Sequence, residues 1–156
     1  MLTWYGNWPL HMAVYCGHEN IVRILLESEA DMTRRFKSDQ YTVLHLATRL
    51  GLIDMMELLL DAGIDIEIGD GRGRTALDAT FLRCRDTSGC YACLGYKPHP
   101  GISIEAMKLL LQRKANIRAG QIGSRPKDKA RKYPNRRIRD LFREYDDHDS
   151  AEDNIL

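Results

Sequence analysis

The sequence predicts an all-α solenoid of stacked helix pairs, and three observations predict it. Gly17 and Gly51, like Leu25 and Leu59, lie 34 residues apart, so a two-helix pattern recurs at a fixed offset. Apolar residues on both sides of each glycine follow the spacing of an amphipathic helix. The composition, 44% hydrophobic and 29% charged, is that of a folded chain, and no apolar run reaches the length of a membrane helix. One repeating domain over residues 2–145 is therefore expected.

The second copy shows the pattern most clearly. Thr42 is expected to cap its first helix, because a hydroxyl at that position accepts from free amides one turn on. That helix ends at Gly51, and a second helix rich in Met and Leu runs from Met55 to Leu60. Gly63 stands where a left-handed residue closes a helix. A helix pair of this size cannot bury its apolar face alone, so neighbouring copies must cover it.

The third copy contains an insertion. Its first helix places Leu77 33 residues after Leu44, close to the offset of the first two copies. Its second helix comes late, because Leu109 matches Leu58 at an offset of 51. Residues 85–101 are therefore expected to form an insertion between the two helices of this copy.

A fourth, degenerate copy is expected at residues 120–145 as a terminal cap. Pro126 and Ala130 keep the spacing of the first copy. Apolar residues return at three positions of its second helix: Ile138, Leu141 and Phe142. The other residues are mostly charged, as suits a terminal repeat with one face in water. Residues 146–156 are acidic, and we expect them to form a flexible tail.

These copies resemble the ankyrin repeat family. The first copy carries the resemblance at Gly6, Pro9, Leu10, His11, Ala13, Gly17, His18, Ile21, Val22, Leu25, Leu26, Ala30 and Asp31. Residues other than the family's usual Thr, Pro or Gly stand at Trp8, Val43, Ala76, Glu29 and Lys114. The resemblance implies a short β-turn or hairpin tip before each helix pair. It also implies repeats over residues 3–35, 37–69 and 70–119.

The function implied by the resemblance is binding of another protein, without catalysis and without a small-molecule substrate. In the family, the contacts come from the concave side, where the tips and the first helices lie. The matching positions here are Trp4, Tyr5, Asn7, Tyr15, Phe36, Asp39, Tyr41, Arg49, Arg72, Arg74 and Arg83. Trp, Tyr and Arg are the residue types that dominate interface energetics. For Trp4 and Tyr5, packing against a preceding repeat is the alternative.

Four members of this set are expected to lie close together and to carry partner binding: Tyr41, Arg49, Arg72 and Arg74. Tyr41 and Arg74 occupy the same position of successive repeats. We expect their polar ends to gain little from packing against their own repeats, so that alanine there leaves stability almost unchanged.

The insertion is the one candidate for a cofactor site. Cys84, Cys90, Cys93 and His99 lie within sixteen residues, and a set of three cysteines and one histidine suits tetrahedral zinc. The spacing matches no standard zinc finger, and only one tight pair is present. We therefore favour a flexible or partner-binding loop and expect no cofactor, with zinc-stabilised recognition as the alternative.

Two further patterns are interpreted as structural. His11 and His45 occupy a position that the family uses for hydrogen bonds between neighbouring turns, and a metal site there would need further ligands. Gly69, Gly71 and Gly73 lack the spacing of a dinucleotide loop, so they predict a tight turn.

The net charge of +1 predicts no polyanion partner for the chain as a whole. The stretch from Arg125 to Arg143 is basic, however, which makes nucleic-acid association through the cap an alternative function. No aromatic residues alternate with these basic residues in a reading motif, and acidic residues follow directly. A solvated capping face is the interpretation that we favour.

The remaining expectations concern location and activity. No basic segment followed by an apolar core opens the sequence, which favours an intracellular protein, cytoplasmic or nuclear, with reduced cysteines. No nucleophile, base and orienting residue occur at a motif-like spacing, so no enzyme is expected. The first copy reads as an interior repeat, which predicts either a longer repeat array or a partner that covers that end.

Overall fold

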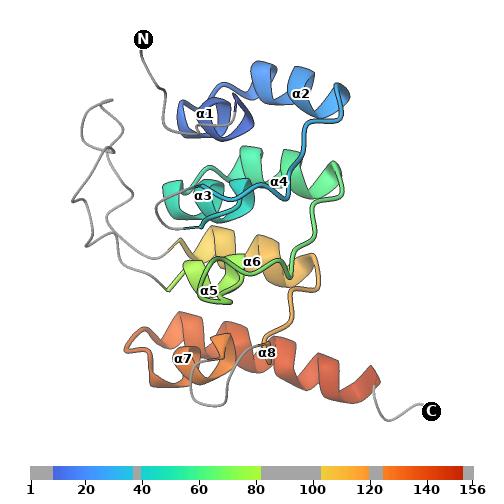
Figure 1. Ribbon diagram of the computed structural model, residues 1–156. Helices are drawn as coiled ribbons and strands as arrows, with labels where there is room; N and C mark the ends of the chain where they lie inside the picture. The colour runs from blue at the N-terminus through green and yellow to red at the C-terminus, as the bar shows by residue number, and fades with distance from the viewer. Residues whose placement is uncertain (1–8, 37–39, 82–102, 120–124, 153–156) are drawn as a thin grey trace.

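The computed structural model describes residues 9–36, 40–81, 103–119 and 125–152. These residues form helices in four consecutive pairs and contain no β-strand (Figure 1). The helices are α1 (Pro9–Tyr15), α2 (Glu19–Glu27), α3 (Val43–Leu50), α4 (Ile53–Asp61), α5 (Ala76–Ala79), α6 (Ile104–Gln112), α7 (Pro126–Lys132) and α8 (Arg136–Glu152). The predicted all-α fold is confirmed. None of the described helices is both long enough and apolar enough to cross a membrane.

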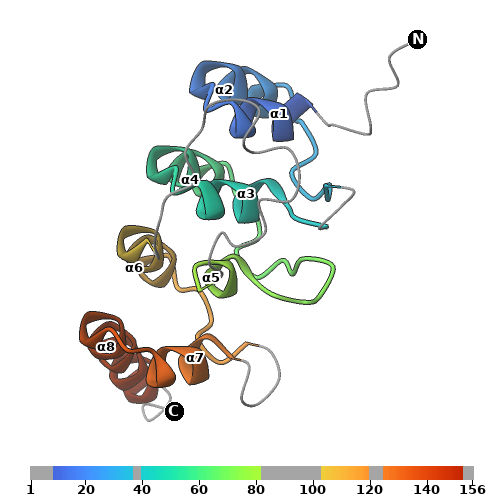
Figure 2. The same cartoon turned by 90° about the vertical axis from the view of Figure 1, so that its left-hand side faces the viewer.

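The helix pairs stack into a solenoid with two layers. Helices α1, α3, α5 and α7 form one layer, and α2, α4, α6 and α8 form the other (Figure 2). Along the stack α1 packs against α3, α3 against α5, α4 against α6, and α6 against α8. The loop before α5 projects from the first layer (Figure 2). This loop, the tip of the third repeat, therefore lies on the side of the stack formed by the first helix of each pair.

The repeat offsets determine which helical positions are equivalent. Helices α2, α4 and α6 each span nine residues, and their first residues differ by the offsets of 34 and 51. Each residue of one helix therefore has a counterpart in the others. The expected insertion, residues 85–101, lies outside the described residues.

Most helix ends follow the sequence pattern. Gly51 and Gly63 have positive φ values of 69° and 84°, as expected for left-handed closing residues. Glu29 and Lys114 adopt the same conformation without glycine, with φ values of 57° and 62°. A side chain in that region is strained, so these two turns are less stable than glycine would make them.

Thr42 differs from its predicted role. It occupies the N-cap position of α3, but its side chain makes no hydrogen bond to a helix amide. Its Oγ1 atom lies 2.8 Å from Nδ1 of His45 instead. Thr75 does cap α5, because its Oγ1 accepts from the amide of Asp78 while the Asp78 carboxylate accepts from the amide of Thr75. The Thr42 hydroxyl therefore bonds His45 instead of capping α3.

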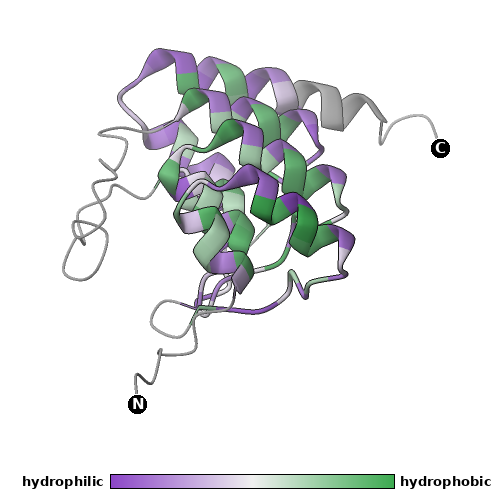
Figure 3. Cartoon of the chain, turned by 90° about the horizontal axis from the view of Figure 1, so that it is seen from above, coloured by the Kyte–Doolittle hydropathy of each residue, from purple (hydrophilic) through white to green (hydrophobic). Residues whose placement is uncertain are grey.

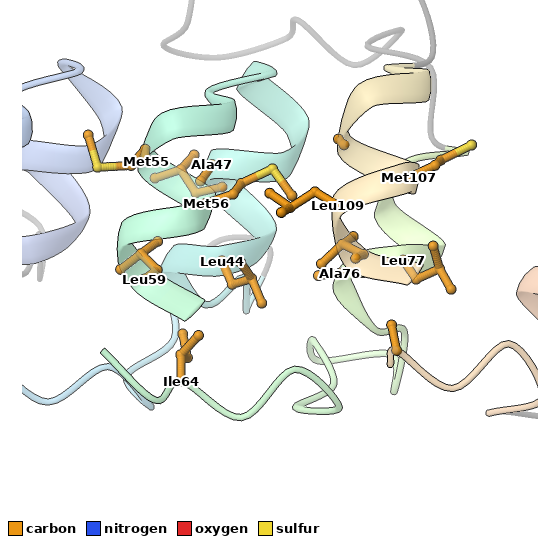
Figure 4. Packing of buried hydrophobic residues seen from close by; sticks show 14 of the residues in the cluster. Leu44, Ala47, Met55, Met56, Leu59, Ile64, Ala76, Leu77, Met107 and Leu109 are labelled. Atoms are coloured by element: carbon orange, nitrogen blue, oxygen red, sulfur yellow. The ribbon is translucent and has the colours of Figure 1, made fainter. Parts of the chain in front are cut away.

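The core runs without interruption through the stack. Leu44, Met56 and Leu59 are fully buried in the second repeat. Figure 4 shows the side chains of Met56 and Leu109 approaching each other between α4 and α6, so one core joins adjacent repeats. Seen along the stack, each helix carries both hydrophobic and hydrophilic residues (Figure 3). The amphipathic spacing in the sequence therefore becomes a shared interior.

Helices α7 and α8 cover the last face of this core. Their apolar residues are buried: Ala130, Ile138, Leu141 and Phe142. The Phe142 ring lies 5.6 Å from the ring of Phe81, which follows α5. The acidic stretch from Asp146 is not a separate tail at its start, because α8 continues through Glu152. Asp146 accepts hydrogen bonds from Arg118 and Lys127, which holds it against the cap.

Candidate protein-binding surface

An aromatic ring and two guanidinium groups meet at the boundary of the second and third repeats. Tyr41 precedes α3, Arg49 lies in the last turn of α3, and Arg74 lies in the turn before α5. The guanidinium carbon of Arg49 is 4.7 Å from the centre of the Tyr41 ring, and that of Arg74 is 6.0 Å from it. Both distances are in the range of cation–π attraction. Arg74 Nη2 also donates to the Tyr41 hydroxyl at 3.3 Å.

Asp70 fixes the position of Arg74. Its carboxylate accepts from the backbone amides of Arg72 and Arg74 at 2.8 and 2.9 Å, and from Arg74 Nε at 2.7 Å. An ion pair of 2.6 Å joins Arg74 Nη2 to the same, fully buried carboxylate. Burial alone would raise the pKa of Asp70, but these hydrogen bonds and the charge of Arg74 hold it below its ordinary value. Asp70 is therefore ionised at neutral pH and aligns the guanidinium.

The glycines of this segment form the predicted tight turn. The amide of Asp70 donates to the carbonyl of Arg74 at 2.8 Å, and the amide of Gly73 donates to the carbonyl of Asp70 at 2.9 Å. Gly73 has a φ of +70°, and a Cβ on Gly69 would lie 3.0 Å from the Cα of Gly73. The close approach requires glycine at position 69, and the left-handed φ favours glycine at position 73.

His11 and His45, which occupy equivalent positions of the first two repeats, tie successive turns together, as the structural interpretation predicted. His11 Nε2 lies 3.3 Å from the carbonyl oxygen of Tyr41, and His45 Nε2 lies 2.7 Å from that of Arg74. The His45 ring also stacks on the Tyr41 ring, with 5.9 Å between centroids. Burial lowers the pKa of His45, so the ring is neutral at pH 7. The Nε2–H of His45 then donates to the carbonyl oxygen of Arg74, and its Nδ1 accepts from the hydroxyl of Thr42.

The structure brings together the predicted cluster but not in the predicted environment. Tyr15 and Tyr41 are buried, and Phe36 is half-buried with its ring 6.2 Å from that of His11. The expectation that Tyr41 and Arg74 gain little from packing is wrong. The Tyr41 ring packs against His45 and lies near the guanidinium groups of Arg49 and Arg74, which enclose it. Arg49 is half-buried and Arg72 is exposed.

The other predicted contact residues lie outside the described residues: Trp4, Tyr5, Asn7, Asp39 and Arg83. The role of the whole set in binding a partner stays a prediction. Two polar contacts inside the array were not predicted. One is Asp70, which aligns Arg74, and the other is an ion pair of 2.6 Å between Asp78 and Lys129. In the third repeat Asp78 stands where the first two repeats have His11 and His45. A buried carboxylate requires a cation or amides nearby, so this difference could have indicated an ion pair.

The candidate zinc ligands Cys84, Cys90, Cys93 and His99 also lie outside the described residues. Within the part of the chain that the structure describes, no group of three His, Cys, Asp or Glu side chains is placed to hold a metal ion. The basic cap is partly neutralised from within the chain. Asp146 pairs with Lys127 and Arg118, and Asp78 pairs with Lys129.

Stacked helix pairs whose tips are tied together by histidines and a buried carboxylate define a helical-repeat scaffold. Comparison with known families agrees with this class. The family model described as ankyrin repeats, three copies, matches residues 2–70. Residues 2–70 thus match the ankyrin repeats, and proteins of that family generally act by binding other proteins.

The curated relatives are ankyrin-repeat proteins of much greater length. The chain is 34% identical over 77 residues to the mouse (Mus musculus) "Ankyrin repeat and SAM domain-containing protein 6", a match that covers 49% of this chain and 9% of the relative. It is 31% identical over 74 residues to the human (Homo sapiens) "Inhibitor of Bruton tyrosine kinase", covering 47% and 6%. It is 38% identical over 77 residues to "Delta-latroinsectotoxin-Lt1a" of Latrodectus tredecimguttatus, covering 48% and 6%. The chain thus spans less than a tenth of these relatives.

Proposed function

We propose that this chain binds another protein through the surface around Tyr41, which we call the tip surface and define by Tyr41, Arg49, Arg72 and Arg74. The observation that carries the proposal is the placement of one buried tyrosine within cation–π distance of two guanidinium groups from successive repeats. Tyr41 itself is enclosed, so its role is to position the arginines. Arg49 and Arg72 supply the accessible part of the surface.

The tip surface is held in place before any partner arrives. Arg74 is fixed by Asp70, and the turn that carries Arg72 is fixed by its amide bond to the same carboxylate. Ordering a long side chain at an interface costs about 0.5–1.5 kcal/mol. Contacts within the free protein meet part of that cost in advance for Arg74, which supports a binding role.

The charge of the tip surface favours an acidic partner segment. Asp70 is neutralised by Arg74, while Arg72 is exposed and its charge has no carboxylate partner in any ion pair of the described residues. Guanidinium groups recognise carboxylates through two parallel hydrogen bonds. We therefore infer that the bound segment carries Asp or Glu side chains.

The test is affinity capture from lysate with matched variants, followed by affinity measurement with the purified partner. Arg72 is exposed, so Arg72→Ala should leave the melting curve unchanged. It should weaken binding by roughly 2 kcal/mol if it is a hot spot. Binding should also fall with rising salt concentration, because the attraction is between charges.

Two control variants separate the tip surface from the other candidate sites. Lys108→Ala removes an exposed charge from the second layer, on α6, and Arg125→Ala removes a half-buried charge from the cap, just before α7. Both should leave binding unchanged. Loss of binding with Arg125→Ala alone would assign function to the cap, and loss upon addition of a chelator would assign it to the insertion.

A further inference from the structure

The first helix pair presents an apolar face at the end of the stack. In Figure 1, α1 and α2 are the outermost described helices, and α3 and α4 cover their other side. Ile21 and Ile24 of α2 are 47% and 60% exposed, and they are the exposed large hydrophobic residues among those described. Leu25, one turn from Ile21 on the same helix, is half-buried.

The counterparts of Ile21 and Leu25 in the other pairs are buried, and those of Ile24 are buried at Leu109 and Leu141 and half-buried at Leu58. The residues in the place of Ile21 are Met55, Ala106 and Ile138, with exposures of 2%, 0% and 1%. Leu59, Leu110 and Phe142, in the place of Leu25, are buried as well. Apolar residues occupy these positions in all four pairs, but among the described helices the exposed large ones lie on α2. The difference is thus one of neighbours and not of sequence.

The stack itself shows what covers such a face. In Figure 4, Met55 extends from α4 toward the first repeat, and Leu109 extends from α6 toward α4. Met56 and Met107 extend in the opposite direction along the stack. Positions equivalent to Ile21 and Ile24 therefore face the preceding helix pair, and the position of Val22 faces the following one.

We propose that the face formed by Ile21, Ile24 and Leu25, which we call the entry face, docks a further ankyrin-type helix pair that precedes this one in the same polypeptide. The incoming pair would present an aliphatic residue at the position that Val22, Met56 and Met107 occupy. This occupant continues an interface that the chain already forms at each later pair, with the same residue chemistry on the receiving side. It also buries two isoleucines that otherwise face water, which is favourable in proportion to the apolar area removed.

The experiment adds the expected neighbour. A copy of residues 37–70 is fused directly ahead of Thr3, which places the copied Met56 34 residues before Val22 and preserves the repeat spacing. The extended chain should melt at least about 5 °C higher than the 156-residue chain. Stability of an array grows with each interface between neighbours, so a docked pair must raise it.

Ile21→Gln tests whether the entry face is the surface that docks. In the 156-residue chain this substitution should change the melting temperature by less than about 2 °C, since the side chain is half exposed. In the extended chain it should lower the melting temperature by about 5 °C or more. Arg23→Gln is the matched control, because Arg23 and its counterparts Glu57 and Lys108 are all exposed, and it should have no effect in either chain.

A local measurement keeps the proposal testable if the extended chain melts in more than one step. Ile21→Cys places a thiol on the entry face, and its alkylation can be followed at that peptide by mass spectrometry. The rate should fall about tenfold or more on going from the 156-residue chain to the extended chain, since reaction then requires local opening.

Three outcomes would overturn the proposal. An equally small effect of Ile21→Gln in both chains would show that the added pair does not dock there. An equally large effect in both would show that the entry face is already covered in the 156-residue chain. A dimer in sedimentation that Ile21→Gln dissociates would make a second copy the occupant.

Discussion

Lys129 donates to the carboxylate of Asp78 at 2.6 Å, so an ion pair ties the third repeat to the cap. At the two preceding boundaries, a histidine bonded to a carbonyl oxygen makes this connection. The Asp78 side chain is almost fully enclosed, and that of Lys129 is one-quarter exposed.

Lys129→Gln should therefore destabilise the protein by about 1–3 kcal/mol, because it leaves a buried carboxylate without its cation. Lys132→Gln, on the same helix but exposed, should stay within about half a kcal/mol. Urea unfolding of both variants measures the difference. Equal stability of the two would mean that the amide of Thr75 alone suffices for Asp78.

The buried histidines should make stability depend on pH. Burial holds the pKa of His45 below its ordinary value of 6.5, so the unfolded chain binds the proton more tightly than the folded chain. The contribution of neutral His45 is complete above about pH 6.5 and is lost as the pH falls toward the folded-state pKa. His11 shifts in the same direction for the same reason.

Unfolding in urea at pH 7.5 and pH 5.5 should therefore show lower stability at the acidic pH. In His45→Gln the difference between the two pH values should shrink, while His18→Gln, which is exposed, should keep it. A full difference in His45→Gln would assign the pH dependence to other groups.

Tyr41 should matter for folding as well as for binding. Tyr41→Ala removes a buried ring that stacks on His45, and a loss of about 3 kcal/mol is expected. Tyr41→Phe removes only the hydroxyl that accepts from Arg74, which should cost about 1 kcal/mol. Chemical denaturation distinguishes the two. A change below half a kcal/mol for Tyr41→Ala would restore the original expectation of a loosely held side chain.

The centre of the array should be sensitive to cavities. Leu59 is fully buried in α4, and Leu59→Ala should cost about 2–5 kcal/mol through lost burial and residual cavity. Leu58, its half-buried neighbour, provides the comparison, and Leu58→Ala should cost clearly less. The midpoint of denaturant unfolding reports both values. A reversed order would mean that the helix register is wrong.

The sequence predicts the repeated part of this fold well. The offset between Leu25 and Leu59 already places them at equivalent positions of α2 and α4, and Gly51 and Gly63 adopt the left-handed conformations that their positions required. These features depend on local spacing and on backbone sterics, which a single sequence contains. The resemblance to a known repeat then supplies the stacking.

The candidate site was harder to predict, because its environment depends on neighbours in space. Tyr41 is polar at its tip, but the ring is enclosed by His45 and two arginines from different segments. Thr42 was expected to cap a helix, and a side chain one turn away binds its hydroxyl instead. Each deviation depends on a side-chain contact, and spacing along the sequence does not reveal which contact forms.

The distance along the chain between paired helices has a consequence for folding order. Two residues separate α3 from α4, whereas 24 separate α5 from α6. The entropic cost of closing a connection grows with its length, so we expect joining α5 to α6 to cost more than joining α3 to α4. We expect folding to nucleate in the first two pairs and α6 to join afterwards on the surface of α4. The segment that widens one repeat thus sets the direction in which the array assembles.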